Sequence, residues 1–321
     1  MKPYHLPALL ALFLCLYACS TQRQDKDAVP VVGFIDYVED PTLASARQGF
    51  FDALSQNGFS TDSGTIEVIH KNAQGDQPAL LQAVDYVIGQ KPALIATNTT
   101  LAMINTIQRN TDIPVFMMVA PRPDLAGINA KTCKALPYLF GVYETPDYID
   151  TSASLIRELF PNAKRVGAIY SQSEVQSVEA MNILKRGCER QGLSLEVLPV
   201  SNSSETQLLT QALLSKGIDV FFALPDNVVF ASFETIAKTC ADKNVPVMTS
   251  EAGLVMRGAV ASFGADMYAW GYQSGQQAAA YLSGNRNLIG QELVQKRQKV
   301  ISRKAIERYS LLPDSTYTRI P

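Results

Sequence analysis

Short apolar stretches alternate with helical patterns along this chain, and the series occurs twice. Between the first two stretches, Leu43, Ala46 and Phe50 fall on one helical face, and Gly58 ends that helix. Strands that alternate with helices predict parallel sheets covered by helices on both faces. The expected strands are 31–35, 66–69, 93–96, 115–119, 166–170, 195–200, 220–223, 247–249 and 259–263.

The two series also share a local pattern. In each, a buried strand leads through a polar turn and a helix to a strand that is entered through Pro-Val, at Pro114-Val115 and at Pro246-Val247. The same order of elements over about 90 residues favours two similar lobes. We therefore predict an α/β protein with two doubly wound, Rossmann-like lobes and a ligand cleft between them.

The change from one lobe to the other is expected near Gly141–Thr145, where Thr145-Pro146 has the pattern of a helix cap. The tail holds one more helix, 266–282, and one more strand, 299–301. The chain should therefore cross between the lobes more than once, through a hinge of several strands. We assign residues 30–142 and about 265–290 to lobe 1, and residues 143–264 and about 291–321 to lobe 2.

The first residues have the features of a secretion signal. Lys2 precedes an apolar run from Leu6 to Ala18, which is shorter than the roughly 20 residues of a membrane span. Leu16-Tyr17-Ala18-Cys19 resembles the box at which bacterial lipoproteins are cleaved and lipidated. We expect a signal peptide over residues 1–18, a lipid anchor on Cys19 and a polar tether over residues 19–30. The alternative is an ordinary cleaved signal with a chance cysteine.

Composition excludes several classes of function. The formal net charge of −2 gives no support for nucleic-acid binding. His5 and His70 are the only histidines, so a histidine-rich metal site is excluded, and no glycine-rich nucleotide loop or G-x-S-x-G motif occurs. We expect no metal, no cofactor and no catalysis.

The cysteines after Cys19 number three, so at most one internal disulfide can form. Cys188 and Cys240 lie in helical patterns, where small buried thiols are common. We expect free thiols there, and the pairing of Cys133 stays open.

Polar residues gather where the expected strands end, and ligands of open parallel sheets bind beyond those carboxyl ends. A zwitterion suits them, because a carboxylate needs hydroxyls and free helix N–H groups while an ammonium needs a carboxylate. We expect Thr97, Asn98, Thr99 and Ser173 to serve the carboxylate, and Asp226, Glu251 or Asp266 the ammonium. Tyr37, Tyr143, Tyr170 and Tyr268 could line an apolar side-chain pocket.

Several of these residues also have a purely structural interpretation. Asp226 and Asp266 have the pattern of helix N-caps, and Ser171 to Glu174 fits a capping box. The tyrosines are as suited to the core or the rim as to ligand contact.

From Val31 to about Leu312 the chain resembles the tryptophan-binding, TrpX-like substrate-binding lipoproteins of ABC transporters, which have the type I periplasmic-binding-protein fold. The matching stretches are Val32-Gly33-Phe34-Ile35, Phe160 to Gly167, Tyr170 to Ser177, Pro225-Asp226-Asn227 and Gly258 to Asp266. Differences occur at Ala120-Pro121-Arg122-Pro123, Tyr143, Gln176 and Leu224, all beside the expected cleft.

The resemblance implies an extracytoplasmic, lipid-anchored receptor that closes its lobes around an amino acid, aromatic or otherwise apolar, and presents it to an ABC permease with its ATPase. The alternative is a sensing module of the same fold that signals to a membrane receptor. The residues implied at the ligand are Tyr37, Glu39, Thr97, Asn98, Thr99, Ser171, Ser173, Ser177, Asp226, Asn227, Glu251 and Asp266.

Overall fold

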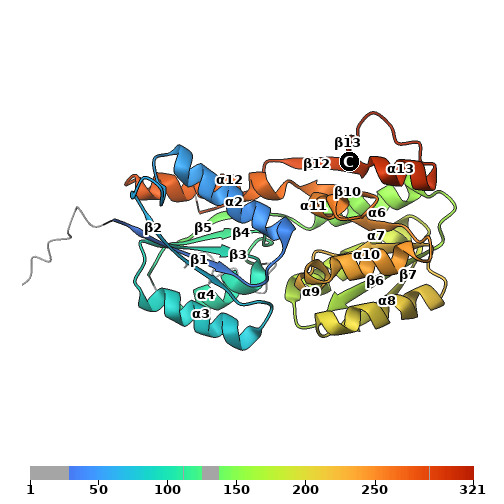
Figure 1. Ribbon diagram of the computed structural model, residues 1–321, viewed down its shortest axis with the longest axis horizontal. Helices are drawn as coiled ribbons and strands as arrows, with labels where there is room; N and C mark the ends of the chain where they lie inside the picture. The colour runs from blue at the N-terminus through green and yellow to red at the C-terminus, as the bar shows by residue number, and fades with distance from the viewer. Residues whose placement is uncertain (1–28, 111, 125–136, 289) are drawn as a thin grey trace, which may run out of the picture.

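The computed structural model describes residues 29–110, 112–124, 137–288 and 290–321. Its strands form two separate sheets, which lie side by side in two lobes (Figure 1). The predicted α/β fold with two doubly wound lobes is confirmed. Within the described residues, no helix is both long enough and apolar enough to cross a membrane.

The six-stranded sheet of lobe 1 has the order β11-β5-β4-β3-β1-β2, and all its neighbouring strands are parallel. The four inner strands of this sheet are almost wholly buried, as expected for a parallel sheet that helices cover on both faces, whereas the two edge strands are polar and partly exposed. The strands are β1 (Val31–Asp36), β2 (Glu67–Asn72), β3 (Leu94–Asn98), β4 (Val115–Met118), β5 (Leu139–Tyr143) and β11 (Gln291–Leu293); the helices are α2 (Pro41–Gln56), α3 (Gln77–Gly89), α4 (Thr100–Arg109) and α12 (Met267–Leu282).

The seven-stranded sheet of lobe 2 has the order β13-β12-β10-β9-β8-β6-β7, and β12 runs antiparallel to β10. The strands are β6 (Arg165–Ser171), β7 (Ser194–Val200), β8 (Val220–Ala223), β9 (Val247–Thr249), β10 (Ala261–Ala265), β12 (Arg297–Ser302) and β13 (Thr318–Ile320). The helices are α6 (Asp147–Leu159), α7 (Val175–Arg190), α8 (Thr206–Ser215), α9 (Asn227–Ala231), α10 (Phe233–Ala241), α11 (Ala252–Met256) and α13 (Arg303–Tyr309), with a 3-10 turn at Ser203–Glu205.

The two lobes share the predicted repeat, and equivalent backbone hydrogen bonds occur in both. In lobe 1 the Ile95 N–H donates to the Pro114 carbonyl at 2.8 Å. In lobe 2 the Phe221 N–H donates to the Pro246 carbonyl at 3.0 Å. The Pro-Val entry therefore joins β4 to β3 and β9 to β8 in the same way.

The chain passes between the sheets at three places, from β5 to α6, from β10 to α12 and from β11 to β12. The expected return to lobe 2 at about residue 291 comes too early, because Gln291–Leu293 pairs with β5 of lobe 1. The crossing follows Leu293. A three-residue polar edge strand carries too little periodicity to be seen in the sequence. The assignment of the other residues to the two lobes stays a prediction.

Helix α12 returns to lobe 1 and packs along α2 (Figure 1). A Cβ atom added at Gly271 would lie 1.8 Å from the Ala46 carbonyl oxygen, and one at Gly275 would lie 2.4 Å from that of Phe50. These glycines therefore allow the two helix backbones to approach closely. The contact fixes α12, whose first turn faces the other lobe.

Apolar packing also joins the lobes. One continuous cluster of buried side chains contains Phe34 of lobe 1 and Phe221 of lobe 2, together with Ala265 and Met267 at a crossing.

Two cysteines, Cys188 and Cys240, are buried in lobe 2 and are free thiols as expected. Cys133 and Cys19 lie outside the described residues.

Two expected helix caps are wrong. Helix α6 has Pro146 instead of Thr145 as its N-cap, and proline has no side-chain acceptor to cap the helix. The Thr145 N–H donates to the Glu144 carboxylate. Helix α7 is capped by Glu174, also without a side-chain bond, so Ser171 and Glu174 form no capping box. Instead, Glu174 turns toward α9 and accepts hydrogen bonds from Asn227.

Candidate ligand-binding pocket

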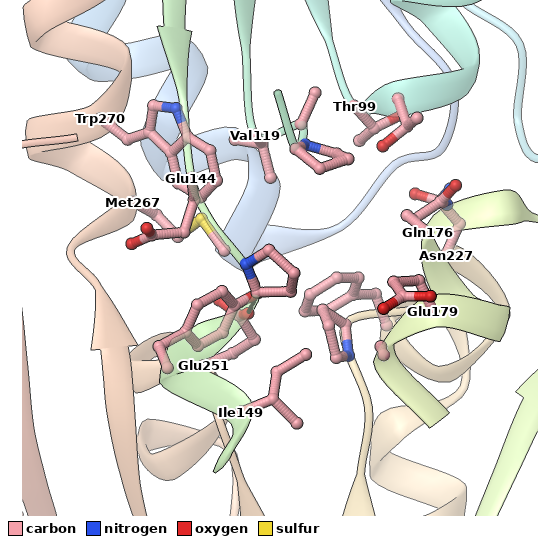
Figure 2. Close-up of a pocket in the computed structure, with 18 residues that line it drawn as sticks. Thr99, Val119, Glu144, Ile149, Gln176, Glu179, Asn227, Glu251, Met267 and Trp270 are labelled. Carbon is pink, nitrogen blue, oxygen red and sulfur yellow. Dashed lines mark hydrogen bonds between the residues drawn. The ribbon is translucent and has the colours of Figure 1, made fainter. Parts of the chain in front are cut away.

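A pocket of about 650 Å³, including space open to solvent, lies between the two lobes (Figure 2). Both lobes and the crossings supply its walls. Lobe 1 provides Thr99, Thr100, Val119, Ala120, Pro121, Met267 and Trp270, and the first crossing with lobe 2 provides Glu144, Pro146, Tyr148, Ile149, Gln176, Glu179, Ala180, Pro225, Asn227, Phe230 and Glu251.

The lobe 1 wall is the end of β3 and the start of α4. Thr99 is the N-cap of α4, has a φ of 81° and makes no side-chain cap bond. Its Oγ1 is buried without a hydrogen-bond partner, as are Thr97 Oγ1 and Asn98 Oδ1. Buried polar atoms are almost always paired, so this edge of β3 is incomplete without a further partner.

A buried cluster holds this wall from behind. The Asn98 amide donates to Asp36 Oδ1 at 2.8 Å and to the Leu43 carbonyl at 3.1 Å. Arg47 and His70 both contact Asp36 Oδ2, which is buried at the end of β1. His70 therefore has a structural position, beside the buried Asp36 carboxylate.

The lobe 2 wall depends on Asp226, which is fully buried at the end of β8. Its Oδ1 accepts hydrogen bonds from the Val228 and Val229 N–H groups at the start of α9. Its Oδ2 accepts from the Ser171 N–H at 2.7 Å and from the Ser177 hydroxyl at 2.5 Å. Burial raises the pKa of this carboxyl, and the four hydrogen bonds oppose that rise. The protein itself thus satisfies both oxygens of Asp226.

Glu174 lies next to Asp226 and links two residues of the pocket wall. Its Oε2 accepts from the Asn227 side-chain amide at 2.7 Å and from the Gln176 amide. Burial, reinforced by the nearby Asp226 carboxylate, raises the pKa of Glu174 to about 8. Since the Gln176 amide nitrogen faces Glu174, the amide oxygen of Gln176, Oε1, is left buried without a partner.

Glu251 follows β9, the strand beside β8, and is the least satisfied acid of the pocket. Its Oε1 accepts from the Tyr148 hydroxyl at 3.3 Å and lies 3.5 Å from the Ser250 hydroxyl. Its Oε2 is buried and has no partner. Burial raises the pKa of Glu251 to about 8.

The remaining acids of the pocket differ in their pairing. Glu144 forms a bidentate ion pair with Arg297, at 2.8 Å and 2.5 Å, across two crossings of the hinge. Burial raises the pKa of Glu144, and Arg297 opposes the rise. Glu179 is partly exposed and lies 3.5 Å from Arg186. Among the lining residues that the structure describes, the ionisable acids are Glu144, Glu179 and Glu251, and no lysine or arginine is present.

Three of the twelve expected ligand residues line the pocket: Thr99, Asn227 and Glu251. The other nine fall into two groups. Five lie directly behind the pocket walls and support them: Thr97, Asn98, Ser171, Ser177 and Asp226. Four have no place in the walls: Tyr37, Glu39, Ser173 and Asp266.

These four residues have partners elsewhere. The Tyr37 hydroxyl donates to the Gly75 carbonyl at 2.8 Å, and Glu39 pairs with Arg47. Ser173 shares a hydrogen bond with the Ser171 hydroxyl. Asp266 caps α12 through the Ala269 N–H and pairs with Lys296, which is the structural interpretation allowed for it.

The apolar part of the pocket was missed in the sequence. Trp270 and Met267 lie on the first turn of α12, and Tyr148 lies on the first turn of α6. Of the expected tyrosines, none of Tyr37, Tyr143, Tyr170 and Tyr268 lines the pocket. The one available signal was that Trp270 is the single tryptophan of the chain, close behind Asp266.

Comparison with known proteins agrees with this geometry. Residues 31–315 match the family model described as ABC transporter substrate binding protein. A tyrosine-binding protein of Clostridioides difficile strain R20291 is 31% identical over 266 residues, which are 82% of this chain and 75% of the relative. The chain therefore belongs to the ABC transporter substrate-binding protein family. Its members are ligand-binding components of transporters, so this is not an enzyme.

Solved structures show the same two-lobed fold. An ABC domain from Streptococcus pneumonia in complex with L-Trp has 23% identity and a TM-score of 0.81, over 90% of this chain and 97% of that one. The ligand-free, open structure of a substrate-binding protein from Clostridium difficile has 25% identity and a TM-score of 0.64, over 91% of this chain and 99% of that one.

Proposed function

We propose that this protein captures a zwitterionic amino acid, aromatic or otherwise apolar, in the pocket between its lobes and delivers it to an ABC importer. One observation carries the proposal. Buried polar atoms without partners lie on facing walls of the pocket, at Thr99 on lobe 1 and at Gln176 and Glu251 on lobe 2. Because an unpaired buried polar group costs about 1–3 kcal/mol, these atoms favour a polar ligand that pairs with them.

The ligand's carboxylate is assigned to lobe 1. Thr99 and Thr100 present their hydroxyls at the start of α4, a helix of ten residues whose first N–H groups receive no side-chain cap. Helix N-termini carry a partial positive charge and free N–H donors, which together suit a carboxylate.

The ligand's ammonium is assigned to the opposite wall. Gln176 Oε1 is an unpaired acceptor, and Asn227 and Glu179 lie near it on the same side of the pocket (Figure 2). Asp226 is not used, because four donors of the protein already occupy its oxygens. An amino acid bound in this way contacts both lobes through its head group.

The ligand's side chain then points toward Trp270 and Met267, on the other side of the pocket (Figure 2). Burying an aromatic or large aliphatic side chain there would contribute roughly 1.5–3 kcal/mol. The tyrosine-binding relative and the L-Trp complex support a ligand of this class.

Lobe closure around the ligand forms part of the proposal. The greater similarity to the L-Trp complex than to the ligand-free, open structure supports a closed arrangement of these lobes. Arg257 of lobe 2 contacts Asp40 and Thr42 of lobe 1. Burial raises the pKa of Tyr37 of lobe 1 to about 12, and nearby carboxylates of both lobes, Glu174, Asp76 and Asp226, add to the rise. A ligand that binds both walls stabilises this form over an open one.

Anchoring at Cys19 and a place outside the cytoplasm complete the proposal, on the strength of the lipoprotein box and the tether over residues 19–30. In cells, Cys19→Ser should move the protein from the membrane fraction to the soluble fraction. A variant that remains with the membrane would contradict the anchor.

Ligand capture is tested on the soluble protein spanning Ser20–Pro321 by thermal shift and calorimetry with each of the twenty amino acids. We expect a raised Tm and measurable heat with at least one aromatic or apolar amino acid. Absence of any response to all twenty would remove the amino-acid assignment.

A further inference from the structure

The two sides of the pocket differ in chemistry (Figure 2). Thr99, Gln176 and Asn227 lie on one side, where their polar atoms suit a head group. Trp270, Met267, Glu144 and Glu251 lie on the other, where the ligand's side chain would reach. A wholly apolar side chain needs no acid on that side, so these two carboxyl groups need an explanation.

Glu144 is fully paired within the protein, whereas Glu251 is not. Arg297 donates to both oxygens of Glu144. Glu251 is 1% exposed, and its Oε1 receives the Tyr148 hydroxyl, but its Oε2 has no hydrogen-bond partner. One oxygen of a residue that lines the pocket is therefore buried and has no partner.

The surroundings of that atom restrict the donor it accepts. Trp270 presents only its ring, since its N–H donates to the Val142 carbonyl at 2.8 Å. Lysine carries three N–H donors and arginine five, and each needs several acceptors when buried. A phenol or an indole carries a single donor on an apolar ring. A single free oxygen fits the second kind of side chain better than the first.

We propose that Glu251 releases its proton to solvent when the ligand binds and, as a carboxylate, accepts a hydrogen bond from an N–H or O–H borne on the ring of an aromatic amino acid. It thereby selects ligands with such a ring donor over those without one. The inference rests on the proposed function, since it presumes that an amino acid occupies the pocket with its head group at Thr99 and Gln176. It makes Glu251 a specificity-determining residue and leaves the head-group contacts unchanged.

Ligand analogues test this without altering the protein. Calorimetry would compare L-tyrosine and L-tryptophan with L-phenylalanine and 4-fluoro-L-phenylalanine, which keeps the ring and nearly the size of tyrosine but has no donor. We expect tyrosine, tryptophan or both to bind at least about tenfold more tightly than either donor-free ligand, because a site built to accept a hydrogen bond rejects analogues that lack it. L-lysine should bind more weakly still.

Variants locate the effect. Glu251→Leu should reduce the preference for the ring donor to less than about threefold, mainly by weakening the ligands that carry it. The matched control is Glu179→Leu, which alters a lining acid on the head-group side. It should weaken tyrosine, tryptophan and phenylalanine alike and so leave the ratio between their affinities unchanged.

The outcomes separate the two proposals. If no amino acid binds, the proposed function fails. If phenylalanine and its fluoro analogue bind as tightly as tyrosine and tryptophan, or if lysine binds most tightly, the inference about Glu251 is overturned while amino-acid capture stands. A preference that persists in Glu251→Leu would also overturn it. Should that variant not fold, the comparison of ligands on the unaltered protein still decides.

Discussion

Asp226 and Glu251 follow neighbouring strands of one sheet, β8 and β9, and both are fully buried acids. Their surroundings are opposite. Asp226 receives four hydrogen bonds, from Val228, Val229, Ser171 and Ser177, whereas one oxygen of Glu251 receives none. A satisfied buried acid stabilises the wall that carries it, and an unsatisfied one is available to a ligand.

The largest effect is expected at the satisfied acid. Asp226→Ala removes the cap of α9 and leaves the Ser171 N–H and the Ser177 hydroxyl without their acceptor. We expect the free energy of unfolding, measured with urea, to fall by about 3 kcal/mol.

A matched control for this loss is Asp266→Ala, which removes an N-cap with a single backbone bond, to Ala269. It should cost about 1 kcal/mol. A loss at Asp226 no larger than that at Asp266 would contradict the structural role given to Asp226.

A smaller effect is expected from pH. The pKa of Glu174 and that of Glu251 are each raised from 4.5 to about 8 in the folded protein. Between these values the folded chain holds protons that the unfolded chain has released, so stability falls as pH rises from 4.5 to 8 and then levels off.

Glu251→Gln removes the charge that becomes buried as pH rises. Without ligand, its unfolding free energy should exceed that of the unaltered protein at pH 8.5, and the difference should nearly vanish at pH 5. Equal pH profiles for the two proteins would mean that Glu251 is not held protonated by its surroundings.

The smallest effect on stability is expected when one hydrogen-bond donor to Asp226 is removed. Ser177→Ala removes one of its four donors and should cost about 1 kcal/mol in unfolding free energy. Because Ser177 does not line the pocket, the ranking of amino acids by affinity should stay the same. A changed ranking would place Ser177 in contact with the ligand.

The local parts of this site were predictable from sequence. Helix caps obey short-range rules, and Asp226 and Asp266 cap α9 and α12 as their patterns allowed. Thr99 and Glu251 were predicted to face the cleft because each follows a buried strand, and both line the pocket. The capping-box interpretation of Ser171 to Glu174 was wrong, because the side-chain amide of Asn227, 53 residues away in sequence, donates a hydrogen bond to the Glu174 carboxylate.

The sequence alone determined the fold class, because strand and helix periodicities are local properties and the Pro-Val repeat marks both halves. Only the tertiary structure decided which acids have partners and where the aromatic groups lie. Trp270 enters the pocket because α12 returns to lobe 1 and packs on α2, and Tyr148 enters it because α6 begins at the hinge. Contacts between residues more than a hundred positions apart depend on chain crossings, which have no local signal.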